Sequence, residues 1–468
     1  MKRYSLTING KLEDTQKYFA VLNPATEKEI SQCPSASLEQ LNKAVSSAKN
    51  AFKKYKFSKI ETRRDILYQV SEKIKHNKES LAELLTQEQG KPLNDALEEI
   101  DSAIKGIIEN AKLDIPVVVL KDDCDTRVEA HYKPRGVMAS ILPWNYPVHL
   151  ACGEIARSII TGNTLVLKPS PETPLATLLL GEIIRDVLPQ GICNIISGDD
   201  DLGKHLVSHP DVVCISFTGS VGTGKAIAQS AGSDLKRVSL ELGGNDAAIV
   251  LPRADVKKIA NELFWAAFSN CGQVCIATKR IYVHSDLKED LIDALVKIAK
   301  TVKVGNGLEE SIQIGPLNNA RQREIVSELV EDAKVNNATI HIGGHKLYER
   351  GYFYAPTIIS NVTNGYRIVD EEQFGPVIPI ISYDNVDEAI RLANGVNVGL
   401  SGSVWGEDTS EAIRVAHQLE CGMSKVNCAF GRLSSAPFGG FKHSGIGRHG
   451  GQWTIQSLIE LQTISIAK

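Results

Sequence analysis

Four short apolar segments in the middle of the chain constrain its fold more than any other feature. Stretches with helical character separate them, and the segments are 137–143 (VMASILP), 163–169 (NTLVLKP), 192–198 (ICNIISG) and 212–220 (VVCISFTGS). Strands that alternate with helices in this way form a parallel sheet with helices on its faces. The sequence therefore predicts an α/β fold. Its 468 residues exceed what one hydrophobic core usually organises, so two or three domains are expected.

Local signals predict further elements on both sides of this region. Ser37 followed by Gln40 reads as a capping box that starts a helix, and a helix from Leu81 to Gln89 should stop at Gly90. The β-branched runs between 115 and 132 indicate a pair of strands. Residues 459–468, IELQTISIAK, indicate a final strand that belongs to no preceding unit.

Composition argues against several classes of partner. The formal net charge is −4 and there is no long basic run, which excludes nucleic acid and anionic lipid. No stretch reaches the roughly 18 apolar residues of a membrane span, and the first residues lack the apolar core of a secretory signal. Nine cysteines without paired spacing fit a reduced compartment, so we expect a cytoplasmic protein.

The glycine-rich segment 217–227 (FTGSVGTGKAI) is the first candidate binding site. Gly219, Gly222 and Gly224 fall where a strand should pass into a helix, so backbone N–H groups there can approach a phosphate. The spacing from Gly219 to Lys225 also resembles a nucleoside-triphosphate loop, but Ala226 lacks the hydroxyl that would hold magnesium. A tight turn without a ligand is the remaining alternative.

Lys168 lies at the end of another predicted strand. Open α/β sheets bind ligands at that edge, where a lysine can hydrogen-bond ribose hydroxyls or a 2′-phosphate. An ordinary solvated lysine is the alternative.

Cys275, in the segment NCGQVC (270–275), is a candidate nucleophile. It follows a glycine in a segment that we expect to be helical on both sides, and a helix N-terminus can lower the pKa of a thiol. A buried, inert cysteine is one alternative, and a metal pair with Cys271 is another. No companion CxxC or histidine spacing accompanies that pair, so no metal site is predicted.

Two further polar residues stand in rigid or glycine-rich surroundings. Glu241 precedes a double glycine after an apolar run, where a carboxylate can act as a general base or simply cap a loop. Asn145 stands between two prolines in PWNYP (143–147), a turn that can aim its amide at an oxyanion. The segments 371–377 and 436–448 are glycine-rich loops.

Together, these features resemble the aldehyde dehydrogenase superfamily. The resemblance extends over nearly the whole chain, from about Asn23 to the terminal strand. It is carried by the order and spacing of Asn145, Lys168, the turn at 217–220, Glu241, Cys275, the segment from Glu372 to Pro376 and the segment from Pro437 to Gly440.

The resemblance implies oxidation of an aldehyde to a carboxylic acid. Cys275 would form a thiohemiacetal and then a thioester, with the oxyanion held by the Asn145 amide and the Cys275 N–H. Glu241 would activate the water that hydrolyses the thioester; since CoA-dependent relatives usually lack this glutamate, water is the expected acceptor. The implied cofactor is NAD, with NADP as an alternative. Its expected contacts are Trp144, Lys168, Ser170, Gly219, Ser220, Gly224, Leu242, Gly243, Gln322, Glu372 and Phe374.

The resemblance also implies a division of the chain. We expect a Rossmann-like cofactor domain at 1–113 and 136–243, an α/β catalytic domain at 244–442, and a small β-element for oligomerisation at 114–135 and 455–468. A strand that adds to a neighbour's sheet makes a homodimer or homotetramer the expected state.

Three departures from the family pattern bear on specificity. Pro171 stands where a ribose-binding glutamate is common, with Glu172 one position later, which weakens the argument for strict NAD preference. Segment 438–448 is most similar to succinate-semialdehyde dehydrogenases, but Ser269 and Gly153 replace two arginines that hold the substrate carboxylate there. Nearby Arg157 and Arg280 keep that substrate as an alternative to a neutral aliphatic, hydroxy or aromatic aldehyde. A catalytically retired dinucleotide-binding protein is the alternative from another class.

Overall fold

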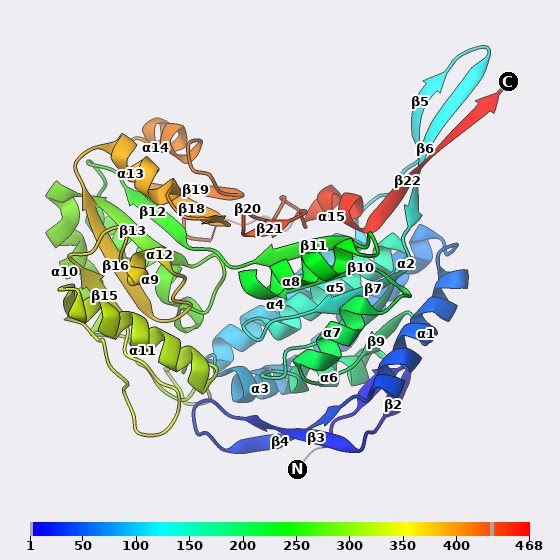
Figure 1. The fold of residues 1–468 in the computed structure, drawn as a ribbon, viewed down its shortest axis with the longest axis horizontal. Helices are drawn as coiled ribbons and strands as arrows, with labels where there is room; N and C mark the ends of the chain where they lie inside the picture. The colour runs from blue at the N-terminus through cyan, green and yellow to red at the C-terminus, as the bar shows by residue number, and fades with distance from the viewer. Residues whose placement is uncertain (1–2, 431–434) are drawn as a thin grey trace.

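Two sheets of mostly parallel strands, each flanked by helices, form the body of the computed structural model, and a narrow third sheet projects from it (Figure 1). The structure describes residues 3–430 and 435–468. The α/β architecture expected from the alternating apolar segments is confirmed.

The first sheet contains all four of the apolar segments predicted to be strands. Its strands lie in the order β2-β1-β9-β8-β7-β10-β11-β21, and those from β9 to β11 are parallel. Their bounds are β1 Leu6–Ile8, β2 Lys11–Glu13, β7 Val137–Ile141, β8 Thr164–Lys168, β9 Cys193–Ile195, β10 Val212–Gly219, β11 Arg237–Leu242 and β21 Gly445–Ile446.

Eight helices precede or connect these strands. The capping box at Ser37 and the left-handed stop at Gly90 both occur where the sequence predicts them. The bounds are α1 Leu38–Tyr55, α2 Ile60–His76, α3 Lys78–Gln89, α4 Leu93–Ala111, α5 Pro147–Thr161, α6 Leu175–Ile184, α7 Asp200–Ser208 and α8 Val221–Gly232; the hairpin β3 Lys17–Leu22 and β4 Glu29–Ser35 lies outside the sheet.

The second sheet has the order β14-β15-β16-β13-β12-β18-β19, in which only β14 runs antiparallel to its neighbour. Its strands are β12 Asp246–Val250, β13 Thr278–His284, β14 Thr339–Ile342, β15 Thr357–Ser360, β16 Val377–Tyr383, β18 Ser401–Trp405 and β19 Met423–Val426. The accompanying elements are α9 Val256–Phe268, η1 Ser269–Gly272, η2 Ser285–Leu287, α10 Lys288–Ala299, α11 Ala320–Val335, α12 Arg367–Asp370, α13 Val386–Asn394, α14 Thr409–Ala416, and the short pair β17 Val398–Gly399 and β20 Phe441–Lys442.

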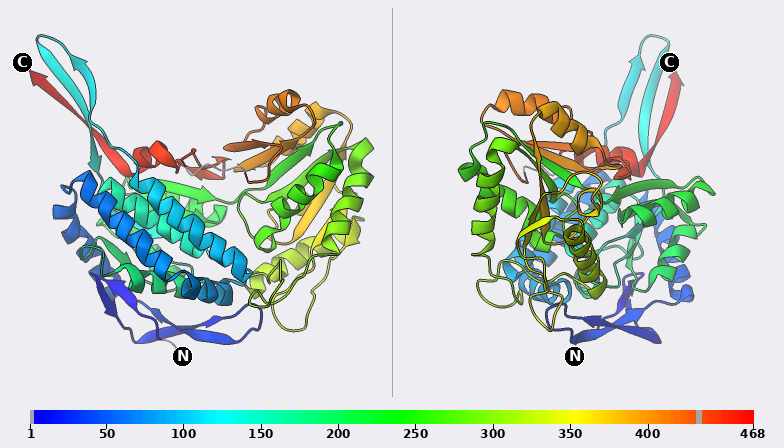
Figure 2. Two further views of the ribbon diagram at one scale, coloured as in Figure 1. Left: turned by 180° about the vertical axis from the view of Figure 1, so that it is seen from behind. Right: turned by 60° about the vertical axis from the view of Figure 1, so that its left-hand side comes forward.

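The third sheet consists of β5 (Val118–Asp122), β6 (Thr126–Pro134) and β22 (Ile459–Ala467), which follows α15 (Gly451–Leu458). The expected strand pair and terminal strand are therefore present, and they pair with one another: β22 runs antiparallel to β6 from Ile459 opposite Pro134 to Ala467 opposite Thr126. Figure 2 shows this sheet standing away from the body. The domain bounds given above stay a prediction.

Candidate active site

The candidate residues gather at one edge of the first sheet because they follow the carboxyl ends of its parallel strands. Connections run from β7 outward to β9 in one direction and from β10 to β11 in the other, so the strand order reverses between β7 and β10. Open α/β sheets bind ligands outside the carboxyl ends at such a point. Trp144 and Asn145 follow β7, Lys168 ends β8, Gly219 ends β10, and Glu241 and Leu242 end β11.

Strand β11 separates two kinds of residue by its alternation. Successive side chains of a strand point to opposite faces, so Ser239 and Glu241 share one face while Leu240 and Leu242 share the other. On the second face Leu242 packs so closely on Gly224 of α8 that a Cβ at Gly224 would lie about 2.6 Å from Leu242 Cδ1. Glu241, only 4% exposed, thus lies on the face opposite the α8 glycine turn.

Cys275 lies in a turn, and the expectation of helix on both sides of it is wrong. Asn270 and Cys271 adopt left-handed backbone conformations with φ of 50° and 58°, Gly272 follows at 72°, and β13 begins at Thr278. Three consecutive left-handed residues end the helical path, so Cys275 does not lie at a helix N-terminus. Gly272 is required here because a Cβ would collide with the Gly375 carbonyl of the loop after α12.

Asn145 is fixed against the Cys275 turn. The side-chain Nδ2 of Asn145 donates to the Gln273 backbone carbonyl at 3.0 Å. The backbone carbonyl of Asn145 accepts from Lys91 Nζ at 2.9 Å and from Asn270 Nδ2 at 3.2 Å. The Asn145 side-chain amide therefore contacts a residue only two positions before Cys275 in the chain. The side chain predicted as oxyanion donor thus contacts the turn that carries the predicted nucleophile, although the two segments belong to different sheets.

A buried charge network behind Asn145 was missed by the sequence analysis. Lys91 and Glu99 form an ion pair with side-chain exposures of 1% and 0%. Glu99 also accepts from the N–H groups of Val148 and His149, each at 3.0 Å, at the N-terminus of α5. Removing one partner of such a pair costs roughly 3–5 kcal/mol, because the other charge stays buried. The network thus holds the asparagine turn rigidly.

The loop carrying Glu372 and Phe374 closes over the Gly243–Gly244 turn. Gly244 N–H donates to Glu372 Oε1 at 3.3 Å, and a Cβ at Gly243 would collide with Glu372 Oε2. Burial raises the pKa of Glu372 to about 7, opposed by the nearby Lys279 ammonium at 3.7 Å. Its charge therefore changes near neutral pH. Phe374 meets Trp144 edge-on with ring centroids 5.4 Å apart.

Two residues hold this loop in place. Gln322 donates from Nε2 to the carbonyls of Gln373 and Phe374, at 2.9 and 3.2 Å. Lys279, which the sequence analysis did not single out, donates to the Val274 carbonyl at 2.6 Å and stands 5.4 Å from the Phe374 ring centroid. Lys279 thus links the Cys275 turn to the loop of Glu372.

The remaining cofactor candidates lie along the same edge of the sheet, after β8 and β10, which flank β7. Lys168 is 2% exposed, so it is not an ordinary solvated lysine, and burial lowers its pKa to about 8. Ser170 is 8% exposed and accepts from the Glu172 N–H at 3.2 Å. Ser220 caps α8 by accepting from the Thr223 N–H, and a Cβ at Gly222 would meet nothing within 4 Å. Among the described residues, no other group therefore fills the space beside Gly222 in the first turn of α8, the kind of position at which helices bind anionic groups.

Both arginines considered for a substrate carboxylate are engaged elsewhere. Arg280 is 1% exposed and donates to the carbonyls of Asn245 and Ala393 and to the Tyr282 hydroxyl. Arg157 forms an ion pair with Glu154. Both guanidinium groups thus already bind protein groups, which disfavours their use in binding a substrate carboxylate.

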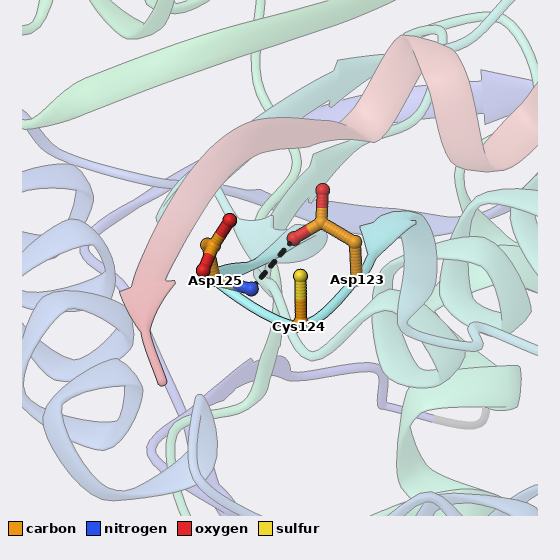
Figure 3. A group of neighbouring side chains, drawn as sticks. All are labelled: Asp123, Cys124 and Asp125. Carbon is orange, nitrogen blue, oxygen red and sulfur yellow. Dashed lines mark hydrogen bonds between the residues drawn. The ribbon is translucent and has the colours of Figure 1, made fainter.

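Among the described residues, the only three side chains close enough to share a metal ion are Asp123, Cys124 and Asp125 (Figure 3). They are exposed on the turn between β5 and β6, and Asp123 accepts from the N–H groups of Asp125 and Thr126. A turn-forming aspartate explains the cluster without a metal. Within the same described residues, no helix is long and apolar enough to cross a membrane.

Comparison with known proteins identifies the family. A model of the aldehyde dehydrogenase family matches residues 11–464, and the chain belongs to that family. An aminoaldehyde dehydrogenase of Pisum sativum is 36% identical over 95% of this chain and 91% of its own. An aldehyde dehydrogenase of Bacillus cereus, solved as its NAD⁺ complex, is 33% identical with a TM-score of 0.97, covering 100% of this chain and 97% of the other.

An NADP-dependent enzyme of E. coli is equally similar in structure, with a TM-score of 0.97 at 31% identity, covering 100% of this chain and 98% of the other. The protein is thus an NAD(P)-dependent aldehyde dehydrogenase that oxidises aldehydes. Membership of this family argues against the alternative of a nucleoside triphosphatase. Three features fit a dinucleotide bound along the strand ends. They are the unfilled space beside Gly222 in the first turn of α8, the buried Lys168, and the Glu372 carboxylate held by the Gly244 N–H.

Proposed function

We propose that Cys275, Glu241 and Asn145 are the catalytic residues and that the enzyme hydrolyses its own thioester. The observation that carries this proposal is the 3.0 Å hydrogen bond from Asn145 Nδ2 to Gln273, which fixes an amide donor beside the Cys275 turn. The buried carboxylate of Glu241, at the end of β11 two strands away from β7, supplies the base. All three residues are present, which argues against a catalytically retired protein.

The reaction then proceeds in two stages on Cys275. The Cys275 thiolate attacks the aldehyde carbon, and the Asn145 amide and the Cys275 N–H stabilise the resulting oxyanion. A dinucleotide bound at the sheet edge would supply the hydride acceptor, and loss of hydride from the thiohemiacetal carbon would leave a thioester on Cys275. Glu241 takes a proton from water, the hydroxide attacks the thioester carbon, and the thiolate departs as the acid is released. Dividing the oxidation in this way replaces one difficult step by two easier ones.

For the cofactor, we propose contacts from the predicted set, with Lys168 and Ser170 at the adenosine end, Gly219, Ser220 and Gly224 near the pyrophosphate, and Glu372 and Phe374 near the nicotinamide. Trp144, Leu242 and Gly243 line the path between these ends. Gln322 supports this site through the loop carbonyls that it holds, rather than through a contact of its own.

Replacing Asn145 with alanine should lower kcat by roughly 10²–10³-fold, because a preorganised oxyanion donor is lost from a buried turn. The measurement is steady-state NAD(P)H formation at 340 nm with a saturating aldehyde. A change confined to KM would argue against the oxyanion role.

We propose neutral aldehydes as substrates, because Arg157 and Arg280 are occupied by protein partners. The test is a panel of straight-chain aldehydes, lactaldehyde, benzaldehyde and succinate semialdehyde, each with NAD⁺ and NADP⁺. We expect kcat/KM to be lowest for succinate semialdehyde. A clear preference for that substrate would overturn the proposal and direct attention to another cation.

We further propose that the chain forms a homodimer or homotetramer in a reducing, cytoplasmic compartment. The projecting third sheet carries apolar side chains that are largely exposed in one chain, with Leu120 at 61% and Leu461 at 66%. An open edge strand with such side chains is normally covered by another chain. Sedimentation velocity should therefore give at least twice the mass of one chain, and a monomer at micromolar concentration would contradict the proposal.

A further inference from the structure

His449 lies beside the proposed general base in the interior of the protein. Its Nε2 is 3.9 Å from Glu241 Oε1 and 3.2 Å from the Ser239 hydroxyl. Glu241 and His449 have side-chain exposures of 5% and 7%. The arrangement therefore connects the carboxylate to a second titratable group that bulk water does not surround.

The backbone around His449 is held firmly, so this contact is built into the fold. Phe438 and His449 exchange two backbone hydrogen bonds, at 2.7 and 2.8 Å, and Gly445 pairs with Glu241 as β21 joins β11. A Cβ at Gly439 would come 2.9 Å from Glu241 Oε1, so this loop also closes directly on the carboxylate.

A row of buried serines continues from Ser239 across the sheet. Ser140, Ser216 and Ser239 are register partners on β7, β10 and β11, and each is at most 1% exposed. Register partners on neighbouring strands lie about 4.8 Å apart with their side chains on the same face. Ser216 and Ser239 are therefore within reach of each other through one bridging water.

The row of buried serines contacts helix α5 through Ser216. The Ser216 hydroxyl donates to Glu154 Oε1 at 2.8 Å, and Glu154 forms an ion pair with Arg157, whose side chain is 14% exposed. Glu154 Oε2 is buried and has no hydrogen-bond partner among the described residues. Charged groups near the row include Glu154 and Arg157 on α5, Arg448 beside His449, and Glu372 beyond the Gly243 turn. Arg135, Arg237 and Glu460 lie near Cys214, two residues before Ser216 on β10.

The chemistry requires a route of this kind if Glu241 acts as proposed. Each hydrolysis leaves one proton on the Glu241 carboxyl, and the next turnover needs the carboxylate again. A buried carboxyl exchanges protons with solvent only through neighbouring donors and acceptors.

We propose that His449 is the first proton acceptor from Glu241, and that Ser239, Ser216 and Glu154 carry the proton to α5, where the partly exposed Arg157 side chain marks the way to solvent. The proton moves from Glu241 to His449 Nε2, which restores the carboxylate. His449 passes a proton to the Ser239 hydroxyl, each hydroxyl gives up the proton it held, and Glu154 receives one. Glu154 then releases its proton to a solvent water beside the partly exposed Arg157, so that every group of the route returns to its starting state. The 3.9 Å separation exceeds a direct hydrogen bond, so the carboxylate must rotate by about 1 Å or use one water. The inference rests on the proposed role of Glu241.

The test uses p-nitrophenyl acetate, which acylates a reactive cysteine without cofactor, and follows loss of the acetyl group from the intact protein by mass spectrometry. His449→Ala should leave acylation unchanged and slow deacylation by about 10–100-fold, with partial recovery in imidazole buffer. Ser216→Ala and Glu154→Gln should each slow deacylation by about 3–10-fold. Ser140→Ala is the matched control, since it lies in the same row on the side away from Glu241, and it should deacylate normally.

Each outcome separates this route from the proposed function. Slow deacylation in Glu241→Gln with a normal rate in His449→Ala would overturn the route and leave Glu241 as the base. A normal deacylation rate in Glu241→Gln would show that Glu241 is not the general base. If His449→Ala does not fold, His449→Gln keeps hydrogen bonding but cannot relay a proton, and it should show the same slow phase. The route would also be overturned if deacylation is slow in His449→Ala without recovery in imidazole, while Ser216→Ala and Glu154→Gln deacylate at normal rates. His449 would then have only a structural role.

Discussion

Replacing Cys275 with alanine should abolish aldehyde oxidation, with kcat falling by at least about 10⁴-fold. A methyl group cannot form the covalent adduct on which both stages depend, and loss of a nucleophile removes most of the rate enhancement of enzymes that work by covalent catalysis. Cofactor binding should be almost unchanged, because the proposed cofactor contacts lie on other segments. The measurements are NAD(P)H formation at 340 nm and binding of the dinucleotide by calorimetry.

Cys271→Ala provides the matched control, four residues away in the same segment. Cys271 is 1% exposed, and burial raises the pKa of its thiol, so it is a poor nucleophile. Its left-handed backbone is retained equally by alanine, since both residues carry a Cβ. This variant should keep its activity. Turnover that survives in Cys275→Ala but disappears in Cys271→Ala would transfer the nucleophile assignment.

The parallel strands of the first sheet could be predicted because their signal is local. Each is a continuous apolar run at a strand length, and β7, β8 and β10 are buried along most of their residues. Strands β2 and β3, by contrast, were not predicted. Strand β2 has one apolar residue among three, so no pattern marks it. Strand β3 is mostly apolar in sequence, but only Val21 is buried, so its run of apolar residues does not correspond to a core strand. Their pairing depends on partners that local sequence does not reveal.

The site was predicted to a similar, uneven extent. Asn145, Lys168, Glu241 and Cys275 stand out because each follows a strand or a rigid turn, and the resemblance to a family orders them. The surroundings of Cys275 were mistaken, because a run of left-handed residues ends a helix without an obvious breaker before Gly272.

Residues that act through long-range contacts escaped prediction altogether. His449 lies in a glycine-rich loop whose sequence carries no catalytic signal, and its contact with Ser239 joins positions 210 residues apart. Lys91 and Glu99 look like ordinary surface charges of a helical region until α5 covers them. Such residues become visible only when the fold has brought their partners together.

Replacing Glu241 with glutamine should separate the two stages of the reaction. Glutamine has nearly the same size and shape, so the close approach of Gly439 to this side chain is kept. It cannot accept a proton from water, and loss of a general base typically costs about 10²–10⁴-fold. Oxidation should therefore give one rapid equivalent of NAD(P)H per site, followed by a steady rate slower by that factor. Mass spectrometry of the quenched enzyme should detect an acyl group on the peptide that contains Cys275.

The size of the rapid phase decides between two explanations of a slow steady rate. A full equivalent of NAD(P)H with accumulated acyl-enzyme places the defect in hydrolysis, as the buried position of Glu241 at the end of β11 leads us to expect. A rapid phase that slows in parallel with the steady rate would mean that Glu241 also activates the Cys275 thiol. An undiminished steady rate would show that another group activates the water, and the proton route through His449 would then lose its starting point.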